Sequence, residues 1–155
     1  MTERGLARTG LGEWALRLLT ASGLGVDAGI HIALAPTQPP GGPISQIDLF
    51  YFEGAISILA LLFVLATGTR IAYVFAFLVA ASALGAVLLY RYVDVGPLGP
   101  LPNMYEPFWD TTKTATTVAE AVAFVAAALG ALTTPTRVRA HQAHHSAQQT
   151  PSTPH

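Results

Sequence analysis

Residues 49–90 read "LFYFEGAISILALLFVLATGTRIAYVFAFLVAASALGAVLLY" and consist of two long apolar runs with a short break between them. The runs cover residues 49–66 and 71–90, and only "TGTR" separates them. Each run is close to the ~20 residues that an α-helix needs to cross a bilayer. Because the break is so short, the two helices must be antiparallel neighbours. The stretch therefore predicts a helical hairpin inside a membrane.

Two further apolar runs, 14–34 and 114–132, flank this hairpin. The whole chain of 155 residues is 52% hydrophobic but only 11% charged. A soluble domain carries about 25% charged residues, so this chain has too little charge to cover a surface that faces water. We therefore predict an all-α bundle of four transmembrane helices over residues 14–132, whose lipid partner is the bilayer itself.

The segments outside the bundle are polar and short. Residues 1–13 are predicted to form a cytoplasmic N-terminal segment, and residues 133–155 a disordered cytoplasmic tail, because the tail has almost no large apolar side chains. Within the tail, "HQAHH" at 141–145 offers neighbouring imidazoles that could hold a metal ion. The net charge is −1 with no basic block, which argues against a nucleic-acid partner. The absence of cysteine excludes disulfides and thiolate metal sites.

The distribution of lysine and arginine predicts the orientation of the bundle. Basic residues flank the start of the first span, the short turn and the end of the fourth span: Arg4, Arg8, Arg17, Arg70, Arg137 and Arg139. The proline-rich loop 35–48 has no basic residue, and acidic residues offset the two in loop 91–113. By the positive-inside rule both termini are cytoplasmic and both long loops face outward. Arg17 and Trp14 are then expected to be anchors at the inner membrane interface.

Ionisable side chains within the spans are the strongest sign of a site, since each costs roughly 2.5–3.5 kcal/mol at the centre of a membrane helix. A rise of ~1.5 Å per residue places Asp27, Glu53 and Glu120 about 6–10 Å below the outer ends of their helices. His31 lies one turn from Asp27 on the same helix face. Arg91 ends the third span on the outer side. We therefore expect Asp27, His31, Glu53, Arg91 and Glu120 to form one buried polar cluster.

Small residues beside these positions predict close helix packing. Gly25 and Gly29 bracket Asp27 with the small-xxx-small spacing that lets two helices approach closely. The fourth span carries a small, partly polar stripe at helical spacing, namely Thr116, Glu120, Ala123, Ala127 and Ala131. Thr116 or Thr117 is expected to hydrogen-bond Glu120 or a ligand.

The residues leave several functions open. Carboxylates crowded at low dielectric cannot all be ionised, which favours proton transfer or the binding of a cation or a ligand amine. Asp27, His31, Glu53 and Glu120 could also hold a hard or borderline metal ion. Haem is not favoured, because His31 is the only histidine in any span and could at most be a lone axial ligand.

Several short motifs resemble those of small four-helix membrane proteins of high-GC actinobacteria. They are "HIAL" at 31–34, "LFYFEGA" at 49–55, "YRYV" at 90–93, "FWD" at 108–110 and "VAEAVAF" at 118–124. The resemblance covers residues 14–132 and implies the same fold, with His31, Glu53, Arg91, Trp109 and Glu120 as its site residues. The chain is more vaguely similar to DoxX-like membrane proteins, some of which are linked to quinone-dependent oxidation.

We predict a non-enzymatic protein of the cytoplasmic membrane that binds a small ligand, an ion or a lipid headgroup in the outer half of the bundle. Asp27, Glu53 and Glu120 would form the charged floor of the site, with Arg91 as counter-charge. The first alternative is a membrane oxidoreductase or metal-dependent hydrolase that uses the same residues. The second is a structural subunit of a membrane complex or homo-oligomer, in which the polar residues only direct helix packing.

Overall fold

The structure, a computed structural model, describes residues 3–135 and is all-helical. Its elements are α1 (Glu3–Leu34), the short 3₁₀ helix η1 (Ala35–Thr37), α2 (Gln46–Thr67), α3 (Arg70–Tyr92) and α4 (Thr111–Thr133). Each of the four apolar stretches lies within one α-helix, and each helix is long and apolar enough to span a membrane. This confirms the all-α, four-helix fold. Most of the tail, with its histidines, lies outside the described residues.

The helix ends follow from local sequence. Ser45 caps α2 in a capping box, in which Asp48 accepts a hydrogen bond from the Ser45 backbone N–H. Gly68 ends α2 in the left-handed region at φ 53°, which glycine adopts without steric cost. Asp110 caps the start of α4. Helix α1 is longer than its apolar run, because residues 3–13 are helical as well.

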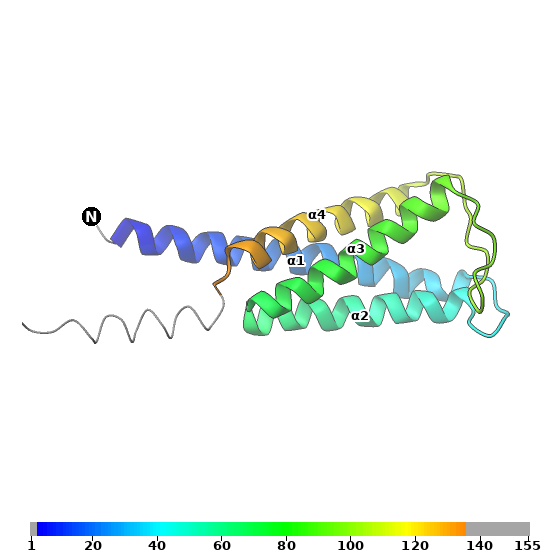
Figure 1. Cartoon of the computed structure of the whole chain (residues 1–155), viewed down its shortest axis with the longest axis horizontal. Coiled ribbons are helices and arrows are strands. Elements are labelled where there is room, and N and C mark those ends of the chain that lie inside the picture. Colours follow the sequence, from blue (N-terminus) through cyan, green and yellow to red (C-terminus); the bar gives the residue numbers. More distant parts are fainter. Residues whose placement is uncertain (1–2, 136–155) are drawn as a thin grey trace, which may run out of the picture.

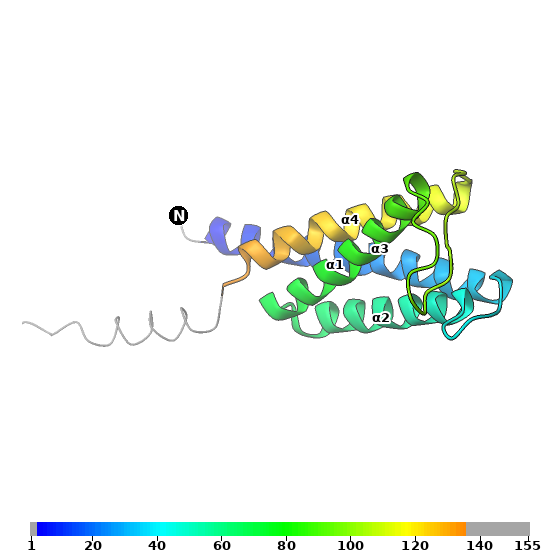
Figure 2. The same cartoon turned by 45° about the vertical axis from the view of Figure 1, so that its right-hand side comes forward.

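The arrangement of the helices is set by α1, which packs against both α2 and α4. Helix α3 packs mainly against α4 and only sparsely against α1. Helices α2 and α3 are close at the Gly68 turn and diverge toward their other ends (Figures 1 and 2). We call that other end of the bundle, where residues 35–45 and 93–110 connect the helices, the loop end.

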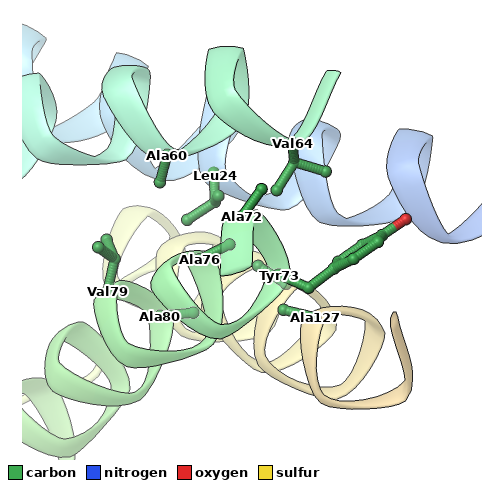
Figure 3. Close-up of a cluster of buried hydrophobic side chains, with 10 residues drawn as sticks. Leu24, Ala60, Val64, Ala72, Tyr73, Ala76, Val79, Ala80 and Ala127 are labelled. Atoms are coloured by element: carbon green, nitrogen blue, oxygen red, sulfur yellow. The ribbon is translucent and has the colours of Figure 1, made fainter. Parts of the chain in front are cut away.

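The bundle has small side chains inside and large apolar side chains outside, as suits a protein surrounded by lipid. Near the turn, the core is mostly alanine packed around Leu24, Val64 and Tyr73 (Figure 3). The ring of Tyr73 lies against Gly130, where an added Cβ would fall 2.3 Å from the ring. Large side chains such as Leu59 and Leu78 are more than half exposed.

Candidate functional site

Two glycines bring three helices together at the site. Gly23 on α1 faces α4 so closely that an added Cβ would lie 2.5 Å from the Ala119 carbonyl oxygen. Gly54 on α2 faces α1, where an added Cβ would lie 2.6 Å from Ile32. Because these contacts flank Asp27 along α1, they draw α2 and α4 toward it.

The glycines predicted for this role were the wrong ones. An added Cβ at Gly25 would meet only Leu61 at 3.9 Å, and one at Gly29 would meet nothing within 4 Å. The small-xxx-small spacing is present, but it faces away from the close helix contacts. The stripe on α4 was predicted correctly for Thr116, Glu120, Ala123 and Ala127, all of which are buried.

Asp27 is the centre of the polar cluster and is 1% exposed. Its Oδ2 accepts a hydrogen bond of 2.7 Å from the Ser57 hydroxyl on α2. Its Oδ1 lies 2.8 Å from Nδ1 of His31, one turn further along α1. That ring nitrogen is hydrogen-bonded to the Asp27 backbone carbonyl at 3.0 Å, and Oδ1 has no hydrogen-bond partner. The imidazole packs against Phe50 with 5.0 Å between ring centroids.

Glu120 meets this group from α4. Glu120 is 2% exposed, and its Oε2 is buried without a hydrogen-bond partner. One ligand atom each from Asp27, His31 and Glu120 lie within 4.8 Å of one another. The predicted hydrogen bond from Thr116 or Thr117 to Glu120 is not formed, because both hydroxyls bond to backbone carbonyls one turn earlier in α4.

Glu53 lies at the edge of the cluster. Its side chain is half-buried, and its Oε1 accepts a long hydrogen bond of 3.4 Å from the Ser57 hydroxyl. Ser57 therefore lies between the Glu53 and Asp27 carboxylates. The sequence analysis did not identify Ser57 as part of the cluster. Its position one helical turn after Glu53 is the signal that could have identified it.

Arg91 forms no ion pair with these carboxylates in the part of the chain that the structure describes. Its guanidinium lies over the rings of Tyr92 and Trp109, at 5.0 and 5.6 Å from their centroids. The physical reason is the divergence of α3 from α2, which carries the end of α3 that holds Arg91 away from α2 (Figure 1). Among residues 10–135, whose side chains the structure describes, no arginine or lysine forms an ion pair with Asp27, Glu53 or Glu120.

Trp109 lines an open groove of about 800 Å³ beside the loop end of α4. The lining residues come from the start of this helix and the residues just before it: Trp109, Asp110, Thr111, Thr114, Ala115, Val118 and Ala119. None of them belongs to the cluster around Asp27. Trp109 is therefore close to Arg91 but is separate from the carboxylates.

A second polar group lies at the other end of the bundle, where the sequence predicted only interface anchors. Arg17 pairs with Glu13 and lies 5.1 Å from the Trp14 ring. Its guanidinium also covers Gly68, where an added Cβ would overlap it at 2.0 Å. Arg17 therefore packs on the turn between α2 and α3.

The cluster of Asp27, His31, Glu53 and Glu120 offers three carboxylates and one imidazole, and no arginine or lysine whose side chain the structure describes pairs with them. Carboxylate oxygens bind hard cations, and imidazole adds affinity for transition metals. The arrangement can therefore bind a cation, or share protons among its carboxyl groups.

Comparisons with known proteins add no family assignment. No protein-family model matches the chain, and no curated protein and no solved structure matches it either.

Proposed function

We propose that the chain is a multi-pass protein of the cytoplasmic membrane that binds a small cation through Asp27, His31, Glu53 and Glu120. Both termini are cytoplasmic in this proposal, so the loop end faces outward and the cation enters from that side. The proposed activity is binding, either alone or as an accessory subunit among other membrane proteins, and not catalysis.

The observation that carries the proposal is a pair of buried carboxylate oxygens without a hydrogen-bond partner: Oε2 of Glu120, and Oδ1 of Asp27, which contacts only the His31 imidazole at 2.8 Å among the described contacts. A buried polar atom without a hydrogen bond costs free energy, and a buried carboxylate costs more. These two residues also lie close to one another. A bound cation would offset the desolvation and the mutual repulsion at once.

The size of the ligand follows from burial. Asp27 on α1 and Ser57 on α2 are almost fully buried, and Leu24 and Ala28, close to Asp27 along α1, are 1% and 2% exposed. Such packing favours a bare ion over an organic ligand or a lipid headgroup. The groove beside Trp109 is large enough for a bulkier molecule, but the four cluster residues do not line it.

Thermal unfolding of the tag-free chain in lipid nanodiscs tests the proposal. Melting temperature is recorded with chlorides of sodium, potassium, magnesium, calcium, manganese, zinc and methylammonium at constant ionic strength. A ligand at 100 times its Kd stabilises the folded state by ~2.7 kcal/mol, so at least one cation should raise the melting temperature clearly.

Glu120→Gln is the diagnostic variant and Glu106→Gln the matched control. Glu106 is an exposed loop carboxylate, 64% exposed and paired with Lys113. The cation-induced rise should disappear in Glu120→Gln and persist in Glu106→Gln. If no cation raises the melting temperature of the unmodified chain, the polar residues serve only helix packing and the proposal is wrong.

A further inference from the structure

We infer that Asp27, His31 and Glu120 form a site for one divalent transition-metal ion. This inference rests on the proposed cation-binding function and names the class of ion. The site joins α1 to α4 in the loop-end half of the bundle.

The geometry is close to that of a metal site. The three ligand atoms lie within 4.8 Å of one another. Zinc binds nitrogen at ~2.0–2.1 Å and carboxylate oxygen at ~2.0–2.2 Å, so two ligand atoms on one ion are about 3.4 Å apart in tetrahedral geometry and at most about 4.4 Å apart when they lie opposite one another. Side-chain movements of about 1 Å would bring all three ligands onto a common ion.

The unpaired atoms indicate where the ion would lie. Oδ1 of Asp27 and Oε2 of Glu120 are buried and have no hydrogen-bond partner, although both belong to residues at most 2% exposed. Oδ1 also lies 2.8 Å from His31 Nδ1 without hydrogen-bond geometry. Binding of an ion through Nδ1 would replace the 3.0 Å hydrogen bond that this nitrogen donates to the Asp27 backbone carbonyl.

Ser57 supplies the orientation that a metal-binding carboxylate needs. Its hydroxyl donates to Oδ2 of Asp27, which leaves Oδ1 directed toward His31. Metal-binding carboxylates are commonly held by such hydrogen bonds, which fix the ligand atom in place. Ser57 itself would not bind the ion.

Charge and ligand type select the ion. A divalent cation neutralises both Asp27 and Glu120, whereas a monovalent cation leaves one buried negative charge. The imidazole of His31 favours zinc, iron or nickel over magnesium and calcium, because the latter two prefer oxygen ligands. No cysteine thiolate competes with these ligands for the metal ion, since the chain has no cysteine.

Equilibrium dialysis against zinc, followed by elemental analysis, tests the inference on the full-length chain in nanodiscs. His141, His144, His145 and His155 are replaced by alanine in every sample, so that histidines of the tail do not bind zinc. We expect about one zinc per chain, unaffected by a tenfold excess of magnesium. Asp27→Asn and His31→Gln should each weaken zinc binding at least tenfold, while Glu106→Gln should not.

Folding is checked for each variant by its melting temperature without metal. If Asp27→Asn unfolds, Glu120→Gln replaces it as the test from the opposite helix. Zinc binding that is equal in His31→Gln and the parent chain overturns the inference. So does a melting temperature that rises with methylammonium, sodium or magnesium but not with zinc, although that result leaves the proposed cation-binding function intact. Failure of every cation to raise the melting temperature overturns both.

Discussion

Ser57 connects two helices through one hydroxyl, and its removal should be costly. In Ser57→Ala, Oδ2 of Asp27 loses its 2.7 Å hydrogen bond inside the bundle. Losing a partner of a buried charged group costs about 1–3 kcal/mol, toward the lower end between membrane helices. We expect Ser57→Ala to lower the free energy of unfolding by about 1 kcal/mol, measured by denaturant titration in micelles.

Ser82→Ala is the matched control for Ser57→Ala. The Ser82 hydroxyl bonds only to the Val79 carbonyl within α3, so its loss breaks no contact between helices. The control should change stability by less than half as much. Equal losses in the two variants would mean that the bond between Ser57 and Asp27 does not hold α1 and α2 together.

The sequence predicted part of the cluster correctly because depth along a helix can be calculated from residue number. Asp27 and Glu120 were expected at one level, and the structure places them together. Depth does not determine how far two helices are apart at that level. Arg91 has a suitable depth but lies on α3, which diverges from α2, and so it packs against Trp109 instead.

The contact between α1 and α4 depends on Gly23. In Gly23→Ala, the new Cβ would meet the Ala119 carbonyl at 2.5 Å and the Ala123 Cβ at 2.9 Å. Because these atoms belong to the backbone or to a short side chain, the helices must move apart. Overpacking of this kind typically costs about 1–3 kcal/mol. We expect a loss of that size in thermal unfolding, together with weaker cation binding.

Gly29→Ala is the control on the same helix. Nothing lies within 4 Å of the added Cβ, and alanine favours a helix over glycine by ~1 kcal/mol in water. Stability should therefore be unchanged or slightly higher. A larger loss in Gly29→Ala than in Gly23→Ala would contradict the described packing of α1 on α4.

The turn between α2 and α3 depends on both Gly68 and Arg17. Gly68→Ala forces alanine into the left-handed region and also places a Cβ into the Arg17 guanidinium. The backbone term alone is about 1–2 kcal/mol. We expect Gly68→Ala to lower the free energy of unfolding by more than the backbone term when Arg17 is present. In an Arg17→Ala background the loss should equal the backbone term alone, as measured by a double-mutant cycle. Equal costs in both backgrounds would show that Arg17 does not pack on the turn.

The helices were more predictable than their contacts. Long apolar runs and capping residues such as Ser45, Gly68 and Asp110 are local signals, and the helices follow them. Which glycine faces a neighbouring helix depends on the rotation of the helix about its axis. A spacing pattern does not report that rotation, which is why Gly25 and Gly29 were wrongly chosen over Gly23 and Gly54.

The proposed orientation of the whole molecule can be tested by labelling, because the chain has no native cysteine. Single cysteines replace Pro40 and Leu98 at the loop end, and Gly10 and Thr133 at the other end; all four positions are exposed. In intact cells, a membrane-impermeant maleimide should label only the first pair. Labelling of the second pair alone would reverse the orientation and place the cluster near the cytoplasm.

Convergence of α1 and α4 on one bound cation is the claim on which the functional account depends. It is tested most directly by the rise in melting temperature that the cation causes in Asp27→Asn, Glu120→Gln and the double variant. If both carboxylates bind the same ion, each single variant abolishes nearly all of the rise, and the double variant loses no more. Two partial losses that add up in the double variant would show that the carboxylates act separately, and would contradict a shared site.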